Sequence, residues 1–301
     1  MLENAVHSHH SAQGWPHDAE ASEIVSIFGV RIANLSHARA LEAVTRLLAR
    51  RATAGVRRRA RTLFFCNANT LTFALRDPAY AAVLNRADLV FGDGIGVRLA
   101  AAMRGARLKA NLNGTDLVPE LLRSRGWAGK RCFILGGEER ANRTAARFLQ
   151  RAFPGVELAG RHHGFFSDAE SSGVIREIDA AAPDVLLVGM GHPRQERWID
   201  THAAALKVPL VVAVGGLFAY WGNGLKRASR LSRRFGMEWF EIMLQQPAKV
   251  RRYLLGGPRF LADAVVFASA DLRAMRGAER AMRGAERAMR GAERAMRGAE
   301  P

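Results

Sequence analysis

The 301-residue sequence contains little cysteine and no long uninterrupted hydrophobic run. Its two cysteines, Cys66 and Cys132, both lie within apolar stretches typical of buried strands. Two cysteines cannot form the disulfide framework of a small secreted domain, so the cysteine content favours a reducing cytoplasm. The longest apolar run, residues 208–221, is interrupted by Pro209 and two glycines and is too short to span about 30 Å of hydrocarbon. The sequence therefore predicts no transmembrane helix.

Several motifs that bind nucleotides or metals are also absent. A G-x-G-x-x-G fingerprint starting at Gly92 or Gly189 fails, because its third glycine position holds Val97 or Arg194. The sequence has no G-x-x-x-x-G-K-[ST] loop and no D-x-D pair, a pattern that holds metal in many nucleotide-sugar transferases. These absences argue against nicotinamide and P-loop enzymes, and they predict a protein that needs neither a metal nor another cofactor.

Positive charge dominates the composition, with 45 Lys and Arg residues against 28 Asp and Glu and a net charge of +17. Such an excess indicates an anionic partner, which composition alone leaves open between nucleic acid, a phosphorylated substrate and an acidic membrane surface. Many of the basic residues follow residue 224 and form no recognisable recognition helix, zinc finger or RNA-binding sheet motif. We therefore expect no nucleic acid as partner.

Residues 24–224 repeat a pattern in which an apolar, β-rich run ends in Gly, Asn or Asp and leads into a helical stretch. Because the runs are continuously apolar, we expect strands buried on both faces, as in a doubly wound, mostly parallel, Rossmann-like α/β sheet. The carboxyl ends of such strands meet in one ligand crevice. The residues at these ends are Asn67, Asn69, Asp93, Gly94, Gly136, Gly137, Gly189, Gly191, Gly215 and Gly216. Glycines and helix N-termini there would admit and bind phosphate.

Asp93 stands out because it lies between Gly92 and Gly94 at the tip of an apolar strand. A carboxylate with such small neighbours is accessible to a substrate hydroxyl and can serve as a general base. The alternative is that Asp93 caps the helix that opens at Ile95, with the glycines serving the turn. The residues themselves do not decide between the two interpretations.

A second group of polar residues lies in GMGHPRQERW, residues 189–198. Pro193 is favoured at the start of a helix, which places Gln195 in the first helical turn, over the end of the sheet. Gln195 is therefore predicted to reach a ligand. For Glu196 and Arg197, in the same helical turn, the alternative to a ligand-binding role is that they are ordinary surface residues of the helix.

The two ends of the chain differ from the α/β region. Residues 1–23 lack the charged and apolar segments of a signal peptide and are predicted to be a disordered leader. Residues 225–270 interleave basic residues with aromatics such as Phe240 and Phe260, which favours amphipathic helices at a membrane interface or an anionic ligand. An ordinary helical subdomain is the alternative. Residues 271–301 carry four RAMRGAE repeats, whose glycines favour a low-complexity tail over a coiled coil.

The order and spacing of several motifs resemble the WecG/TagA/CpsF glycosyltransferases, family 26. These motifs are NANTLTFALRDPAYAAVLNRADLVFGDGIGV, NGTDLVPELL, FILGG, GMGHPRQERW, VGGLFAYWGNGLKRA and GMEWFEIMLQQPAKVRRYL. The resemblance implies an inverting transfer of a sugar from a UDP-sugar to a polyprenyl-diphosphate-linked saccharide at the cytoplasmic membrane face. Such reactions build cell-surface polysaccharides such as teichoic acid linkages, enterobacterial common antigen and exopolysaccharides.

The resemblance also implies roles for individual residues. The general base of the family matches Asp93, its pocket polar positions match Asn67 and Asn69, and the glutamine of its PKQE motif matches Gln195, with Arg194 in place of the lysine. The arginine of its KRAP motif matches Arg227, which the resemblance assigns to the diphosphate. Arg233 and Arg252 are further candidates for this cationic role.

We therefore expect a peripheral enzyme that binds an anionic membrane surface through residues 225–270, which are implied to close over the active site. UDP-N-acetylmannosamine, its uronic acid and UDP-glucose are all possible donors by this resemblance. The alternative to an enzyme is a non-catalytic protein that binds nucleic acid or a UDP-sugar.

Overall fold

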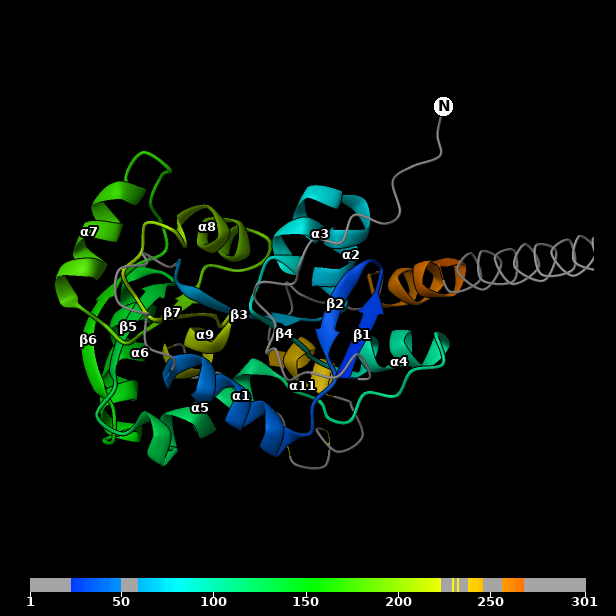
Figure 1. Cartoon of the computed structure of the whole chain (residues 1–301), viewed down its shortest axis with the longest axis horizontal. Coiled ribbons are helices and arrows are strands. Elements are labelled where there is room, and N and C mark those ends of the chain that lie inside the picture. The colour runs from blue at the N-terminus through cyan, green and yellow to red at the C-terminus, as the bar shows by residue number, and fades with distance from the viewer. Residues whose placement is uncertain are drawn as a thin grey trace, which may run out of the picture.

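The computed structural model describes residues 23–49, 59–222, 229, 232, 238–245 and 256–267. Its centre is one sheet of eight strands in the order β1-β2-β4-β3-β8-β7-β5-β6 (Figure 1). The strands are β1 (Ile24–Ile27), β2 (Val30–Ala33), β3 (Arg61–Cys66), β4 (Leu89–Gly92), β5 (Arg131–Gly136), β6 (Glu157–His162), β7 (Val185–Gly189) and β8 (Leu210–Ala213). Only the pairing of β1 with β2, at one edge of the sheet, is antiparallel among the described pairs, which confirms the mostly parallel sheet.

Helices follow most strands, as the alternating sequence pattern predicts. They are α1 (His37–Ala49), α2 (Ala68–Arg76), α3 (Pro78–Asn85), α4 (Ile95–Met103), α5 (Gly114–Arg123), α6 (Glu139–Ala152), α7 (Ser171–Ala181), α8 (Arg194–His202), α9 (Leu217–Gly222) and α11 (Glu238–Gln245), with a 3-10 turn, η2, at Arg125–Trp127. A further helix covers residues 256–267.

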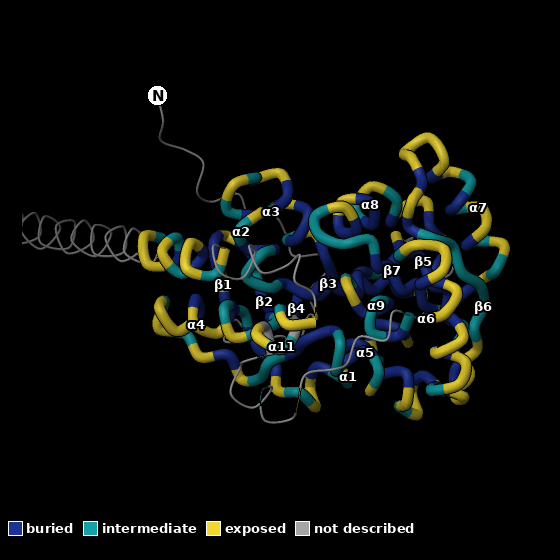
Figure 2. Tube along the Cα trace, turned by 180° about the vertical axis from the view of Figure 1, so that it is seen from behind, coloured by how far each residue is buried: buried dark blue, intermediate teal, exposed yellow. Residues whose placement is uncertain are grey.

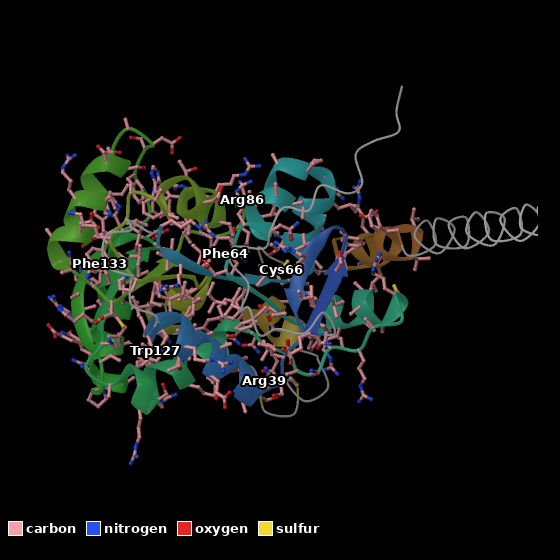
Figure 3. The ribbon with its side chains drawn as sticks, viewed as in Figure 1. Arg39, Phe64, Cys66, Arg86, Trp127 and Phe133 are labelled. Carbon is pink, nitrogen blue, oxygen red and sulfur yellow. The ribbon has the colours of Figure 1, made fainter. Side chains whose placement is uncertain are left out.

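The helices cover both faces of the sheet, which therefore has a buried core on each side (Figure 2). One face, here called the α8 face, packs against α2, α3, α4, α7 and α8. The other, the α6 face, packs against α1, α5, α6 and α9 and contains the buried ring of Trp127 (Figure 3). Successive residues of β3 alternate between the two cores, with Phe64 on the α8 face and Phe65 on the α6 face. This arrangement confirms the doubly wound class, because both faces of the inner strands β4, β3, β8, β7 and β5 are buried.

Two neighbouring strands, β5 and β7, send the chain in opposite directions. From β5 the chain passes through α6 to the edge strand β6, whereas from β7 it passes through α8 to the inner strand β8. Because α6 and α8 lie on opposite faces, neither of them covers the carboxyl ends between these two strands. Ligands of open α/β sheets bind at such a switch point, so the topology places the expected crevice beside β5 and β7.

The helix over residues 256–267 packs against the sheet domain. Phe260 is 2% exposed, and its ring lies 5.7 Å from that of Phe28 in an edge-to-face arrangement. Ala264 is also buried, and Asp263 forms an ion pair with Arg76 of α2 at 3.9 Å. Figure 1 shows this helix in orange beside α2 and β1. At Phe260 the structure therefore shows a core contact, as the alternative of an ordinary helical subdomain has it.

No helix in the described part of the chain combines the length and the apolar character that crossing a bilayer requires. The predicted membrane association of residues 225–270 and the closure of this segment over the site stay predictions. Most of that segment, residues 1–22 of the predicted leader and the RAMRGAE repeats lie outside the described residues. Glu23 is described, and it is buried and paired with Arg39, so the prediction of disorder is wrong at this last residue of the leader.

Candidate active site

Asp93 leaves the sheet directly after β4, with its side chain partly exposed. Gly92 is needed there because a methyl group on it would lie 3.2 Å from Val97 and 3.3 Å from Leu108. Gly94 is needed for a different reason, since its φ of +92° is in the region that favours glycine. Among the described residues a methyl group on Gly94 would meet no atom within 4 Å, so the described part of the chain leaves space beside the Gly94 backbone.

The local geometry bears on the two interpretations of Asp93. Helix α4 begins at Ile95, and Gly94 occupies its N-cap position, so Asp93 lies one residue before the cap. The backbone here is held by two hydrogen bonds: Asp93 N–H donates to the Cys66 carbonyl at 2.9 Å, and Gly94 N–H donates to Asn111 Oδ1 at 2.7 Å. The capping position is thus not that of Asp93, and its role as a base stays a prediction.

Asn67 and Asn69 lie beside Asp93 at the same edge of the sheet. Cys66 pairs with Gly92 in the β3–β4 ladder, so the chain leaves the sheet at neighbouring positions at Asn67 and Asp93. Asn67 caps α2, because its Oδ1 accepts from the N–H groups of Asn69 at 3.0 Å and Thr70 at 3.1 Å. The side-chain oxygen of Asn67 is therefore committed to the helix, and contact of its side-chain nitrogen with a substrate stays a prediction. The side chain of Asn69 is partly exposed in the first turn of α2.

The glycine turns at the switch point are packed closely against each other. Gly136 pairs with Gly189 between β5 and β7, and a methyl group on Gly136 would overlap the Gly189 carbonyl. Gly137 N–H donates to that same carbonyl at 3.1 Å, and Gly191 N–H donates to Gln195 Oε1 at 3.3 Å. These two N–H groups are thus used within the protein, contrary to the expectation that the turns offer them to phosphate. Contacts of the turns with a nucleotide stay a prediction.

Gln195 joins the turns that follow two neighbouring strands. Its side chain is fully buried, and Oε1 accepts from Gly191 after β7 and from Gly215 after β8, the latter at 3.1 Å. Its Nε2 donates to Glu196 Oε1 at 2.7 Å. In this structure both ends of the Gln195 amide bond to the protein, which gives the residue a positioning role, while a direct contact with substrate stays a prediction.

Glu196 is not helix surface, and that interpretation of the sequence is wrong. The side chain is fully buried, and besides Gln195 it accepts from the Tyr80 hydroxyl at 3.1 Å and bonds His192 Nδ1 at 2.6 Å. Arg197, in contrast, is exposed, as that interpretation has it. The sequence carries one signal for this group, the spacing of four residues from His192 to Glu196, but the partner Tyr80 lies 116 residues away from Glu196.

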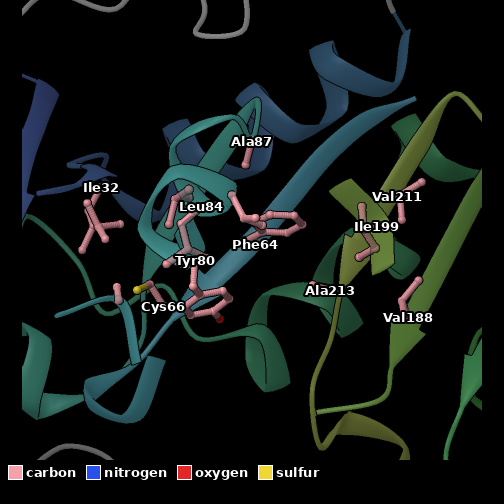
Figure 4. Close-up of a cluster of buried hydrophobic side chains, with 14 of the residues drawn as sticks. Ile32, Phe64, Cys66, Tyr80, Leu84, Ala87, Val188, Ile199, Val211 and Ala213 are labelled. Carbon is pink, nitrogen blue, oxygen red and sulfur yellow. The ribbon is translucent and has the colours of Figure 1, made fainter. Parts of the chain in front are cut away.

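The buried carboxylate and Asp93 share a neighbour, the Cys66 thiol at the end of β3. Burial raises the pKa of Cys66 well above its usual value, and the charges of Glu196 and Asp93 raise it further. Burial likewise raises the pKa of Tyr80, together with the charge of Glu196 and the hydrogen bond to it. Figure 4 shows the Tyr80 ring beside Cys66. Cys66 and Tyr80 therefore stay protonated, and the Cys66 thiol is near enough to both carboxylates to feel their charge.

A pocket of about 320 Å³ lies at the carboxyl ends of β5 and β6, beside Gly137. It is lined by Glu138, Glu139, His163 and Phe165. Glu139 accepts two hydrogen bonds from Arg161, both at 2.9 Å, and these bonds, with those from Arg143, lower the pKa of Glu139 to about 2. Phe165 is 67% exposed, so its ring offers an apolar surface next to the switch point.

Some predicted residues cannot be placed. Arg227, Arg233 and Arg252, the candidates for binding the diphosphate, lie outside the described residues. Within the described ranges, no three His, Cys, Asp or Glu side chains come together as a possible metal site. This observation does not test whether the protein needs a metal ion, so its predicted activity without metal stays a prediction.

The doubly wound sheet, with a carboxylate and polar side chains gathered at the carboxyl ends of its strands, defines a Rossmann-like α/β protein. The sequence profile of the glycosyl transferase WecG/TagA/CpsF family matches residues 25–273, and the chain belongs to this family. It is therefore a glycosyltransferase, which confirms the resemblance of the motifs.

Named relatives give more detail. An N-acetylglucosaminyldiphosphoundecaprenol N-acetyl-beta-D-mannosaminyltransferase of Bacillus spizizenii is 34% identical over 181 residues, which cover 60% of this chain and 70% of the relative. Proteins of the same name from two Staphylococcus aureus strains are 30% identical over 217 residues and 29% identical over 230 residues. These alignments cover 71% and 76% of this chain and 82% and 87% of the relatives.

Proposed function

We propose that the protein transfers N-acetylmannosamine, with inversion, from its UDP-sugar to the N-acetylglucosamine of a polyprenyl-diphosphate-linked acceptor. The names of the three relatives support this donor sugar and this acceptor. The observation that carries the proposal is the position of Asp93 at the tip of β4, with open space beside Gly94 and next to Asn67.

In the proposed reaction Asp93 takes the proton from an acceptor hydroxyl while that oxygen attacks the anomeric carbon of the donor. The bond from the anomeric carbon to the diphosphate breaks on the opposite face, and UDP leaves with the bonding electrons. General base catalysis of this kind contributes about 10²- to 10⁴-fold to a rate. Negative charge develops on the leaving diphosphate and requires fixed cations or other donors, the role proposed for Arg227, Arg233 and Arg252.

We place the nucleotide over the carboxyl ends of β5 and β7. The switch point and the neighbouring pocket with its exposed Phe165 ring support this position. The sugar then extends along the sheet edge, past β8 and β3, toward Asp93 beyond β4. We also propose that the enzyme works at the cytoplasmic face of the membrane as a peripheral protein, because its acceptor is a lipid and its net charge is +17.

The proposal is tested by offering the full chain a panel of radiolabelled UDP-sugars with short-chain polyprenyl-diphosphate-linked N-acetylglucosamine, in the presence of EDTA. A labelled lipid product from UDP-N-acetylmannosamine alone supports the donor, the acceptor and the independence of metal together. A product that forms from another donor would correct the sugar. A product that forms only without EDTA would contradict independence of metal. No product from any donor, together with tight binding of a UDP-sugar, would instead indicate a binding protein.

A further inference from the structure

His192 lies in the crevice that we assign to the donor, and no motif or relative gives it a role. It follows Gly191 in the turn after β7, and its side chain is 13% exposed. Its Nε2 lies 3.6 Å from the position that a methyl group on Gly215 would occupy, in the turn after β8. The imidazole therefore covers the carboxyl ends of two adjacent strands, β7 and β8.

Glu196 fixes the orientation of this imidazole. The distance from His192 Nδ1 to Glu196 Oε1 is 2.6 Å, and Glu196 also accepts from Gln195 and Tyr80. A carboxylate has no proton to donate, so the proton of this short bond belongs to Nδ1. In the neutral imidazole the other nitrogen, Nε2, then carries the lone pair and acts as an acceptor.

Nε2 itself has no partner in the described part of the chain. All hydrogen bonds of His192 there involve Nδ1. Among the described residues, Trp127 Nε1 is the one buried side-chain nitrogen or oxygen that lacks a hydrogen bond. Nε2 of His192 also lacks a described partner, so it must keep some exposed surface. The buried Glu196 carboxylate thus holds the imidazole at Nδ1, and Nε2 remains available for a further hydrogen bond.

We propose that His192 is a substrate-binding residue of the donor site, whose Nε2 accepts a hydrogen bond from a sugar hydroxyl of the UDP-sugar. Glu196 is its positioning residue. A lone pair on Nε2 repels phosphate oxygens and attracts hydroxyl groups, so the ribose and the transferred hexose are the two possible sources of that hydroxyl. This inference rests on the proposed function, because it takes a nucleotide-sugar as the ligand of the crevice.

The test uses two substitutions that separate the two ring nitrogens. The amide nitrogen of asparagine occupies the place of Nδ1, so His192→Asn keeps a donor for Glu196 but removes the group at Nε2. The longer glutamine side chain of His192→Gln places an amide near Nε2 and restores an acceptor there. Calorimetry then measures the binding of UDP and of UDP-N-acetylmannosamine to the full chain.

We expect His192→Asn to bind the donor about three- to tenfold more weakly, the effect of one neutral hydrogen bond, with an unchanged melting temperature. His192→Gln regains part of the affinity. If the hydroxyl belongs to the ribose, the affinity for UDP falls as well; if it belongs to the hexose, only the affinity for the UDP-sugar falls. In the transfer assay KM for the donor rises while kcat stays within about twofold, as expected for lost ground-state binding.

His202→Asn serves as the matched control, because His202 lies at the other end of α8 and packs against Trp198. The control is expected to bind both nucleotides as the wild type does. Wild-type affinity in His192→Asn would overturn the inference, and so would a fall in kcat alone. If the wild type itself binds neither nucleotide, the proposed donor site is overturned first, and the inference falls with it.

Discussion

Replacing Phe260 by alanine is expected to release the helix over residues 256–267 from the sheet domain. The Phe260 ring is 2% exposed, and its edge lies 3.4 Å from where a methyl group on Gly96 would be. Truncating a buried phenylalanine costs about 3–5 kcal/mol. Of this, the edge-to-face contact with Phe28 accounts for about 0.5–1.5 kcal/mol. Ala264 is the other buried apolar side chain in this helix, and Phe267 also packs edge-to-face against Phe28 at 5.3 Å. Phe260 is therefore the largest buried contact of the helix, and its loss should weaken the attachment substantially.

The expected loss is local because the sheet keeps both of its cores. Hydrogen exchange followed by mass spectrometry should show faster exchange over residues 256–267 in Phe260→Ala, with little change in β3, β4 and β8. Val266→Ala is the control, since Val266 lies on the same helix and is 68% exposed, and an exposed substitution changes stability by about 0.5 kcal/mol or less. Unchanged protection of the helix in Phe260→Ala would refute the reasoning that Phe260 anchors it.

Three further outcomes follow from the structure. Gly136→Ala should yield unfolded or insoluble protein, because its methyl group would overlap the Gly189 carbonyl; a soluble variant with wild-type stability would contradict this packing. Arg161 lowers the pKa of Glu139 in the folded state, so the contribution of Glu139 to stability is present above the unfolded value of about 4.5 and is lost as pH falls toward 2. The difference in urea stability between wild type and Glu139→Gln should therefore shrink over this range, and a constant difference would argue against the ion pair. Native Cys66 should resist iodoacetamide at pH 8 and react after unfolding, because burial raises its pKa; rapid labelling of the native protein, detected by mass spectrometry, would contradict its burial.

Continuous apolar runs were sufficient to predict the strands and the doubly wound class. The runs that became β3, β4, β5, β7 and β8 have few polar residues, and only burial on both faces accommodates such strands. The hydrophobic runs do not predict the order of the strands in the sheet, because that order depends on packing between segments distant in sequence. The placement of β8 between β3 and β7 is an example: it brings the turn at Gly215 next to Gln195.

The candidate site was predicted where one residue and its neighbours in sequence carry the signal. The glycines around Asp93 indicated a tight, open turn, and the structure shows that Gly92 is small for packing and Gly94 for its backbone conformation. Glu196 was missed because a charged residue in a first helical turn is usually solvated. Its burial depends on the Tyr80 hydroxyl, which the fold brings from α3.

The C-terminal segment shows where composition leaves two interpretations open. Basic residues alternating with aromatics along residues 225–270 fit a membrane interface or an ordinary helical subdomain, and Phe260, in the core beside Phe28, agrees with the second, while membrane association stays a prediction. An aromatic side chain on an amphipathic helix packs equally well against a membrane or against the same chain, and the sequence pattern is the same in both cases.

The most direct test of the account is the turnover of Asp93→Asn in the transfer assay, measured together with its affinity for UDP. The substitution keeps the size of the side chain and removes the base, so turnover should fall by about 10²-fold or more while the affinity for UDP stays that of the wild type. Asp200→Asn is the control; it removes the ion pair between Asp200 and Arg86, away from the carboxyl edge of the sheet, and should leave turnover unchanged. Near-normal turnover in Asp93→Asn would contradict the assignment of Asp93 as the general base.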